Sequence, residues 1–251
     1  MKTIRSGLAI ASGAALLLGT SACSAQDGGE GETLHILAAA SLDQAFTQII
    51  DDFSAEHPDV EVAPLVTAGS QDLVQQVIEG APADVLALAS EPSAAPLEEA
   101  GVETDFSIFA ENTLVIAVQP GNPHDIQGLE DLEAEDLRIA ICAVEVPCGA
   151  ATEELLGLAG VEIAGATEET SVSSVLAKAE LGEVDAALVY RSDVVTSSGD
   201  LEAVEPEQAA EVVNRYPITA LGDSPAATAF VEYVRSEAGR EVLEEAGLIV
   251  P

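Results

Sequence analysis

Residues 34–53, with the sequence LHILAAASLDQAFTQIIDDF, join a short apolar run to an amphipathic stretch. The apolar run, Leu34–Leu37, has the length and composition of a buried strand. After it, apolar residues recur every three or four positions and predict one face of a helix, made of Leu42, Ala45, Phe46, Ile49, Ile50 and Phe53. Ser41, with Gln44 three residues later, has the spacing of a capping box at the helix start. A strand, a turn of small residues and a helix form the repeating unit of an α/β protein.

The same alternation continues along the chain and predicts an α/β fold with mostly parallel strands. Further strands are expected at Val60–Val66, Val85–Ala89, Leu114–Val118, Leu137–Ile141, Ala186–Val189 and Ile218–Leu221. Further helices are expected over residues 70–80, 150–158, 172–182, 225–236 and 238–246. A chain of 251 residues, 48% of them hydrophobic, can form one large domain or two modest ones with real cores.

The composition is strongly acidic. The chain has 45 Asp and Glu against 8 Lys and Arg, a formal charge of −37 that repels nucleic acid and anionic membrane surfaces. DNA or RNA binding is therefore not expected. Aromatic residues make up 3% and Trp is absent, which leaves few side chains for stacking bases or lining a drug-sized pocket. The ligand is expected to be small.

The first 23 residues have the pattern of an export signal. Lys2 and Arg5 precede an uncharged run, Gly7–Gly19, which is short for a membrane span. The run ends in Thr20-Ser-Ala-Cys23, which resembles the lipobox of bacterial lipoproteins, with Thr in place of the usual Leu. We expect lipid on Cys23, an anchor on the outer face of the cytoplasmic membrane, and a flexible tether over 24–32. The alternative is an ordinary signal cut near Ala22.

Cys142 and Cys148 remain as one pair once Cys23 is assigned to the anchor. In an oxidising compartment a disulfide is the default state of such a pair, and closing this small loop is worth about 2 kcal/mol. A metal site is the alternative interpretation. Two cysteines without a nearby His make a poor ligand set for a metal ion.

Four expected helices begin with small or neutral polar residues, at Ser41, Ser70, Cys148-Gly149 and Ser171-Val172. The first turn of a helix offers unpaired N–H groups and the positive end of a dipole, which together attract anions without a charged side chain. Each start taken alone is explained by ordinary capping. Only their convergence would make a binding site, and spacing does not show convergence.

Several motifs occur in the order expected of one family: Leu37-Ala-Ala-Ala-Ser-Leu42, Gly69-Ser70, Gly80-Ala-Pro-Ala-Asp-Val85, Asn112-Thr-Leu-Val-Ile-Ala-Val118, Gly121-Asn-Pro123, Pro147-Cys-Gly149, Leu188-Val-Tyr-Arg-Ser-Asp193, Tyr216-Pro217 and Gly247-Leu-Ile-Val-Pro251. In these motifs the chain resembles the molybdate-binding proteins of bacterial ABC importers. The resemblance implies a two-lobed periplasmic-binding-protein fold of type II, with the ligand in the interlobe cleft. Lobe 1 would hold residues 33–116 and 204–251, and lobe 2 residues 117–203.

The resemblance also implies a ligand set of five residues. Ser41 and Ser70 would donate from side chain and main chain, Cys148 and Val172 from their backbone N–H groups, and Tyr190 from its phenol. Cys148 departs from the family, in which Ala often stands there, but a backbone donor does not depend on the side chain. The implied protein is a monomer without cofactor or catalytic residue, which passes molybdate or tungstate to a membrane permease.

Neutral donors would also select among anions. A cage with no acceptor facing the ligand penalises a protonated phosphate, because its O–H would lack a partner. Sulfate, another tetrahedral oxyanion or a small organic anion remains the alternative ligand for the same fold.

Two other classes of function were weighed. A serine hydrolase built on Ser41 or Ser70 is disfavoured, because neither serine lies in Gly-x-Ser-x-Gly and no His is well placed. A calcium-binding module is disfavoured because the acids are scattered and no EF-hand-like loop occurs. Asp84 and Asp193 are expected to cap loops or helices. The three histidines, at positions 35, 57 and 124, share no metal-binding or catalytic spacing and are expected to be structural or exposed to solvent.

Overall fold

The structure is a computed structural model that describes residues 33–251. The predicted export signal, the lipid-bearing Cys23 and the tether over 24–32 lie outside these residues. None of the helices in the described part is both long and apolar enough to cross a membrane.

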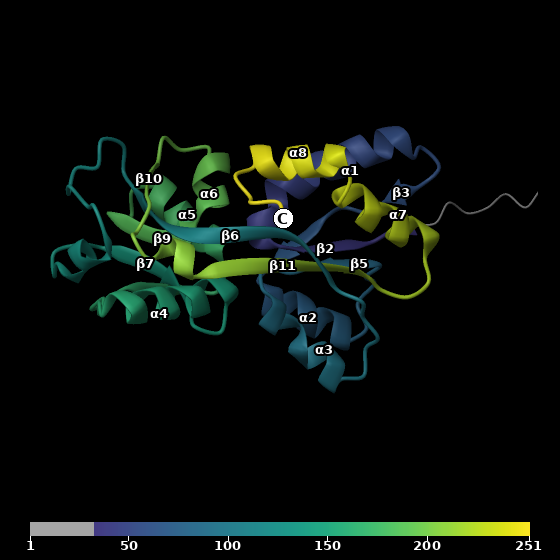
Figure 1. The fold of residues 1–251 in the computed structure, drawn as a ribbon, viewed down its shortest axis with the longest axis horizontal. Coiled ribbons are helices and arrows are strands. Elements are labelled where there is room, and N and C mark those ends of the chain that lie inside the picture. The colour runs from purple at the N-terminus through teal and green to yellow at the C-terminus, as the bar shows by residue number, and fades with distance from the viewer. Residues whose placement is uncertain (1–32) are drawn as a thin grey trace, which may run out of the picture. The chain divides into compact units, whose positions relative to one another are not determined.

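One mixed sheet organises this part of the chain (Figure 1). Its strand order is β4 (Val66–Ala68), β2 (Ile36–Ala39), β5 (Val85–Ala87), β11 (Val213–Ala220), β6 (Ser107–Val118), β9 (Ala186–Tyr190), β7 (Ile139–Cys142) and β8 (Thr167–Glu169), with β10 (Glu202–Val204) also paired to β6. A separate parallel pair joins β1 (Thr33–Leu34) to β3 (Glu61–Val62).

The pairing is parallel at both ends of the order and antiparallel at its centre. β2 pairs in parallel with β4 and β5, and β7 pairs in parallel with β8 and β9. Between these groups, β11 is antiparallel to both β5 and β6, and β6 is antiparallel to β9 and β10. The expectation of mostly parallel strands is therefore wrong for the centre of the sheet.

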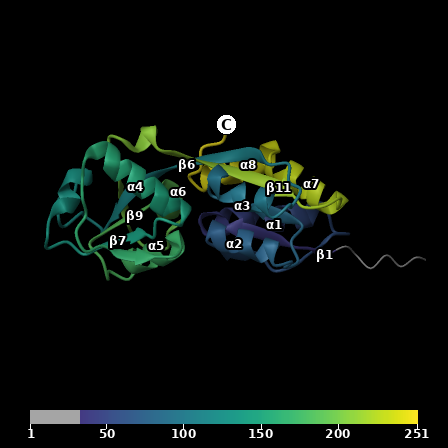
Figure 2. The ribbon, with the colours of Figure 1, turned by 90° about the horizontal axis from the view of Figure 1, so that it is seen from below.

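Helices cover the sheet in two groups (Figures 1 and 2). The first group contains α1 (Asp43–Glu56), α2 (Ser70–Ile78), α3 (Ala95–Glu99), α7 (Pro225–Val234) and α8 (Glu237–Glu245). The second contains α4 (Pro147–Ala159), α5 (Val172–Glu180) and α6 (Arg191–Thr196). α4 and α5 both contact β9, whose five residues are all buried, as expected for a strand covered on both faces.

The core of the first group has two layers. On β2, Ile36 and Ala38 pack in a cluster with α1, α7 and α8, whereas Leu37 packs in a cluster with α2 and α3. Alternate residues of a strand point to opposite faces, so one short strand serves both layers. Figure 1 shows α1, α7 and α8 on one side of the sheet and α2 and α3 on the other.

A separate core belongs to the second group, and β6 links the two. Phe109 and Ala110 of β6 pack in the first core, and Leu114–Val118 pack in the second. β11 returns in the same way, because Val212 just before it packs in the second core and Tyr216 in the first. The chain thus crosses between the cores at 111–113 and at 213–215. Below, lobe 1 means the residues around the first core, 33–110 with 216–251, and lobe 2 means those around the second, 114–212; the boundaries at 116/117 and 203/204 stay a prediction.

Several predicted elements differ from the observed ones. The run Val60–Val66 is not one strand but two short ones, because Pro64 lies between them and has no N–H for a ladder bond. α4 begins at Pro147 rather than near Ala150, with proline at the first helical position, where its missing N–H costs nothing. The short helices α3 and α6 were not predicted.

The predicted capping box at Ser41 is also wrong. α1 begins at Asp43 and has no side-chain cap, and Ser41 lies in a preceding 3-10 turn, Ala40–Leu42. Its hydroxyl group bonds to the phenol of Tyr216 instead.

Candidate functional site

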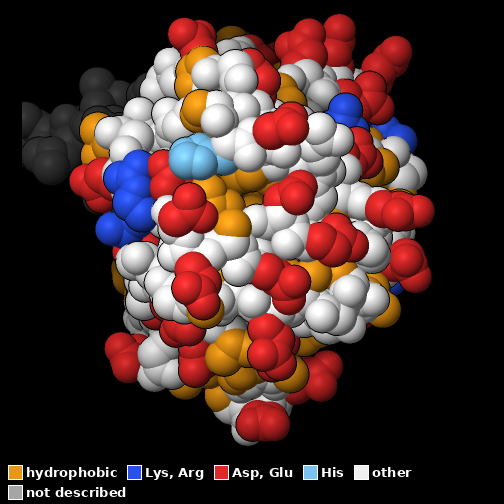
Figure 3. All heavy atoms as spheres, turned by 90° about the vertical axis from the view of Figure 1, so that its left-hand side faces the viewer, with side chains coloured by type: hydrophobic (Ala, Val, Ile, Leu, Met, Phe, Trp, Pro, Cys, Tyr) orange, Lys and Arg blue, Asp and Glu red, His pale blue; other side chains and the backbone are white. Residues whose placement is uncertain are grey.

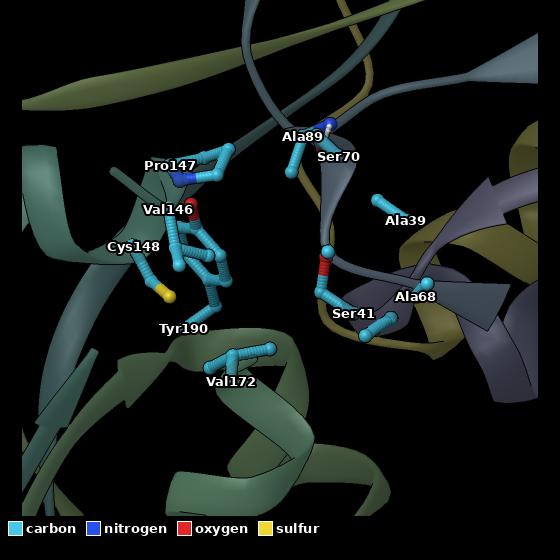
Figure 4. A pocket seen from close by; sticks show the side chains of 12 residues that line it. Ala39, Ser41, Ala68, Ser70, Ala89, Val146, Pro147, Cys148, Val172 and Tyr190 are labelled. Carbon is cyan, nitrogen blue, oxygen red and sulfur yellow. Dashed lines mark hydrogen bonds between the residues drawn. The ribbon is translucent and has the colours of Figure 1, made fainter. Parts of the chain in front are cut away.

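A small pocket lies between the two lobes, at the carboxyl ends of the parallel strands (Figure 4). The loops that follow β2, β4 and β5 contribute from lobe 1, and those that follow β7, β8 and β9 contribute from lobe 2. Its lining consists of Ala39, Ala40, Ser41, Ala68, Gly69, Ser70, Ala89, Val146, Pro147, Cys148, Val172 and Tyr190. The cavity volume is about 10 Å³, close to the least that can hold one water molecule, so any ligand of this pocket must be small.

All five residues of the predicted ligand set line this one pocket: Ser41, Ser70, Cys148, Val172 and Tyr190. Figure 4 shows Ser41 and Ser70 on one side and Cys148, Val172 and Tyr190 on the other. The fold thus brings the predicted ligand residues together at one place, which their spacing along the chain could not show. Their role in binding a ligand stays a prediction at this point.

Ser70 is the first residue of α2 and follows the end of β4 directly. Its hydroxyl oxygen accepts a hydrogen bond from the backbone N–H of Ala89 at 3.0 Å. The hydroxyl hydrogen of Ser70 therefore remains available to the pocket. Ser70 is almost fully buried, so this donor is held away from bulk water.

Cys148 and Val172 offer backbone donors. Cys148 is the second residue of α4 and Val172 is the first residue of α5. The first four N–H groups of an α-helix have no carbonyl partner within the helix. Both residues line the pocket at the positive end of a helix dipole, which favours a negative charge there.

The start of α4 is held tightly against the end of β7. A disulfide joins Cys142, the last residue of β7, to Cys148. Next to it, a Cβ added at Gly149 would lie 1.9 Å from the carbonyl oxygen of Ala143, a distance that no side chain can occupy. Glycine is required here because helix and loop backbones approach each other directly.

Tyr190 ends β9, and its phenol is an unpartnered polar group. The residue is 1% exposed, and its hydroxyl oxygen is buried with no hydrogen-bond partner among the described residues. Burial raises the pKa of Tyr190 well above the ordinary value of a phenol, so the group stays protonated and can donate. A buried donor without a partner costs about 1–3 kcal/mol, and a ligand that accepts from it removes this cost.

Asp193 supports Tyr190 from the first turn of α6. Its carboxylate accepts the backbone N–H of Tyr190 at 2.8 Å, which confirms the expectation of a capping role. Burial raises the pKa of Asp193 to about 7, while the hydrogen bond from Tyr190 works in the opposite direction. Asp193 does not line the pocket.

The pocket lining contains no charged side chain. In the described part of the chain, no group of three or more His, Cys, Asp or Glu residues is placed to hold a metal ion. The donors are three hydroxyls and the N–H groups at the starts of helical turns, all of them neutral. Such a set can bind a small anion, which accepts hydrogen bonds from every direction.

Histidine takes no part in the pocket. His35 bonds to Asp84 at 3.1 Å, His57 stacks on Phe53, and His124 lies 3.5 Å from Asp185. All three histidines are at least partly exposed, as expected, and Asp84 accepts the backbone N–H of His35 at 2.7 Å in the loop before β5. Ser41 and Ser70 therefore have no general base beside them in the pocket lining.

Two glutamine side chains connect the lobes beside the pocket. Nε2 of Gln71, on α2, donates to the carbonyl oxygen of Thr170 at 3.4 Å. Nε2 of Gln44, on α1, donates to the carbonyl oxygen of Thr196 at 2.5 Å. Lobe 1 and lobe 2 are thus joined directly by two side-chain hydrogen bonds.

Sequence reasoning missed the residues behind the pocket wall. Tyr216 bonds to Ser41, and Asn112 bonds to Tyr216, yet both were singled out only as parts of motifs. The available signal was a polar residue, Asn112, within an apolar strand, since a buried polar side chain needs a partner.

Two α/β lobes, joined by two long strands and enclosing a small neutral pocket, define a type II periplasmic binding protein. This class binds its ligand between the lobes. The chain belongs to the family of bacterial extracellular solute-binding proteins, whose family model matches residues 34–249.

Individual relatives agree with this assignment. The chain is 39% identical over 223 residues to the molybdate-binding protein ModA of Mycobacterium tuberculosis, covering 87% of this chain and 85% of the relative. The structure resembles the periplasmic molybdate-binding protein of Azotobacter vinelandii, with a TM-score of 0.76, 20% identity and coverage of 87% and 99%. It also resembles the sulfate-binding protein SubI of M. tuberculosis, with a TM-score of 0.72, 19% identity and coverage of 86% of each chain. The two structural likenesses concern the fold.

Proposed function

We propose that this protein captures molybdate, and also tungstate, between its lobes and delivers the ion to an ABC importer in the membrane. The observation that carries the proposal is the lining of the pocket: neutral donors from both lobes, with no charged side chain. The 39% identity to a molybdate-binding protein over most of the chain supports this choice of ligand.

In the proposed complex, five residues make about seven hydrogen bonds to one tetrahedral dianion. Ser41 and Ser70 donate through hydroxyl and main chain, Cys148 and Val172 through the main chain, and Tyr190 through its phenol. Hydrogen bonds to a charged partner are worth roughly 1.5–3 kcal/mol each, and each helix start adds about 0.3–1 kcal/mol. Together they offset the dehydration of the ion.

The acidic surface does not oppose this binding strongly. Figure 3 shows acidic side chains scattered over one face of lobe 2, with few basic ones among them. Charges on the surface are screened over a Debye length of about 8 Å at physiological salt. Affinity is therefore set by the donors in the pocket, and the surface charge mainly slows the arrival of an anion. We interpret the acid excess as an adaptation to solubility in a salty medium.

We further propose that binding closes the lobes, with 33–110 and 216–251 moving against 114–212. The crossing segments 111–113 and 213–215 are the hinge, since the cores divide there. The bonds from Gln71 to Thr170 and from Gln44 to Thr196 would hold the closed state. The protein then acts as a carrier and not as an enzyme, without a resident cofactor.

The surroundings of the protein complete the proposal. The sequence at 20–23 favours export and a lipid on Cys23, which would place the monomeric binding domain on the outer face of the cytoplasmic membrane. The permease of the importer is the partner that receives the ion. Mass spectrometry of the mature N-terminus tests the lipid on Cys23, and an unmodified cysteine would contradict it.

Sulfate is the second candidate ligand, because a sulfate-binding protein shares the fold. A thermal-shift series with molybdate, tungstate, sulfate and phosphate separates the two. A ligand present at a thousand times its dissociation constant adds about 4 kcal/mol of stability. We expect large shifts with molybdate and tungstate and none with phosphate. A shift with sulfate alone would replace the proposed ligand, and no shift with any oxyanion would refute the proposal.

A further inference from the structure

Behind Ser41 lie two buried polar side chains that do not line the pocket. Asn112 belongs to β6 and Tyr216 to the adjacent strand β11, where the two lobes meet. Both are almost completely buried, at 1% and 0% exposure. Buried polar groups are retained in proteins only when they are hydrogen-bonded, so their bonding pattern is informative.

The amide of Asn112 has a fixed orientation. Its Oδ1 accepts the backbone N–H of Thr113 at 3.0 Å. Because that neighbour is a donor, Oδ1 must face it and Nδ2 must face the other way. Nδ2 then donates to the hydroxyl oxygen of Ser192 at 2.8 Å and to the phenol oxygen of Tyr216 at 3.3 Å.

The phenol of Tyr216 therefore receives a hydrogen bond from Asn112 and has one hydrogen of its own to give. Ser41 Oγ lies 3.1 Å from the phenol oxygen, at a distance where either oxygen can be the donor, and it can accept this hydrogen. Burial raises the pKa of Tyr216 far above its ordinary value, so the phenol keeps this hydrogen. We assign the direction from Asn112 to Tyr216 and from Tyr216 to Ser41, because the phenol then uses both its oxygen and its hydrogen.

The hydroxyl oxygen of Ser41 thus accepts a hydrogen bond from Tyr216, and its own hydrogen remains available to a ligand in the pocket. Ser70 is in the same condition, because its oxygen accepts from Ala89 N–H. The phenol of Tyr190 has no hydrogen-bond partner among residues 33–251. All three hydroxyls of the pocket therefore keep a hydrogen to give to the ligand, whereas Ser41 and Ser70 each have only one lone pair left to accept a proton from it. A ligand that carries a proton is disfavoured for this reason.

We propose that Asn112 and Tyr216 are positioning residues that hold the Ser41 hydroxyl as a donor and thereby select a fully deprotonated oxyanion over a protonated one. This inference rests on the proposed function, because it concerns the same pocket. The inference assigns a part of the ligand specificity to two residues that do not line the pocket.

A double-mutant cycle tests whether Tyr216 acts through Ser41. Tyr216→Phe, Ser41→Ala and the double variant are titrated calorimetrically with molybdate, tungstate, sulfate and hydrogen phosphate at neutral pH. Tyr233→Phe is the matched control, since it removes a phenol of lobe 1 whose neighbour at 3.5 Å is Glu56, away from the pocket.

In the wild-type background, Tyr216→Phe is expected to weaken binding of the preferred dianion about three- to tenfold, the value of one neutral hydrogen bond. In the Ser41→Ala background it is expected to have no further effect. The affinity ratio of hydrogen phosphate to the dianion should rise about tenfold in Tyr216→Phe, because Ser41 is then free to turn and accept. Tyr233→Phe should leave both quantities unchanged.

Equal weakening by Tyr216→Phe in both backgrounds, or an unchanged phosphate ratio, would overturn the inference and leave Tyr216 a packing residue. If Tyr216→Phe does not fold, Asn112→Val takes its place in the cycle, because it releases the phenol to turn, and the same outcomes apply. If the wild-type protein prefers sulfate, the proposed ligand is contradicted. The double-mutant cycle then tests the inference with sulfate as the preferred dianion. Wild-type protein that binds hydrogen phosphate best, or none of the four, would overturn both proposals.

Discussion

Replacing Tyr190 by Phe should make the free protein more stable and its binding weaker. The phenol oxygen is buried and has no hydrogen-bond partner in the described part of the chain, which costs about 1–3 kcal/mol. Phenylalanine fills nearly the same volume, keeps the edge-on contact with Tyr216 at 5.9 Å between ring centres, and removes this cost. The unliganded variant should therefore gain stability of about 1 kcal/mol or more.

The same substitution should weaken the binding of molybdate, because the ligand loses its hydrogen bond from the phenol. One hydrogen bond to a charged acceptor is worth roughly 1.5–3 kcal/mol, so molybdate affinity should fall about 10- to 150-fold. At a concentration that gives the wild type about 4 kcal/mol of ligand stabilisation, a variant weakened about 30-fold keeps about 2 kcal/mol.

Chemical denaturation with and without molybdate measures both effects on the same samples, and calorimetry gives the dissociation constants. Tyr233→Phe serves as the control, because its hydroxyl lies near Glu56 and outside the pocket. The reasoning is refuted if Tyr190→Phe lowers the stability of the free protein, or if molybdate affinity stays within twofold of the wild type.

Three other changes probe the supports of the pocket. Gly149→Ala should destabilise the protein by more than about 3 kcal/mol and weaken binding, because the new Cβ would collide with a carbonyl oxygen. Gly157→Ala, in the last turns of the same helix where no atom lies close, should stabilise the protein by up to about 1 kcal/mol. Thermal melts compare the two variants, and equal effects would contradict the argument. Replacing both Cys142 and Cys148 by Ala should lower the free energy of unfolding by about 2 kcal/mol. The affinity for molybdate should stay within a few-fold of the wild type, because Cys148 donates through its backbone N–H. Loss of binding in a variant that still folds would contradict this. Burial raises the pKa of Asp193 in the folded protein from 3.8 to about 7, so the folded state binds the proton more tightly and the free energy of unfolding falls as pH rises from about 4 to 7. Asp193→Asn, which can still accept the Tyr190 N–H, should lose this pH dependence and be more stable than the wild type by up to about 4 kcal/mol above pH 7. Parallel profiles of stability against pH for the two proteins would contradict this role of Asp193.

Much of the fold follows from local patterns in the sequence. The amphipathic faces of α1, α2 and α5 and the apolar runs of β5 and β9 were placed within a few residues, because burial of one face dictates the spacing. The long central strands were harder. β6 was recognised only from Leu114 onward, since its first half carries Glu111, Asn112 and Thr113, which lie where the chain passes from one core to the other.

The site shows the limit of local reasoning more sharply. Ser41 looks like a helix cap in sequence, but a tertiary bond to Tyr216, 175 positions away, takes its hydroxyl. Val172 has no functional side chain, and only the resemblance to a family pointed to its N–H. The convergence of both with Tyr190 depends on how strands of two lobes end at one edge, which is a property of the assembled sheet.

A calorimetric titration with molybdate at low and at high sodium chloride tests the neutral-donor site most directly. A site made of neutral donors on a protein of charge −37 should bind one ion per chain, and added salt should leave the affinity unchanged or raise it slightly by screening the acidic surface. No binding of molybdate, or an affinity that falls steeply with salt as it does for a site built on Lys and Arg, would contradict this.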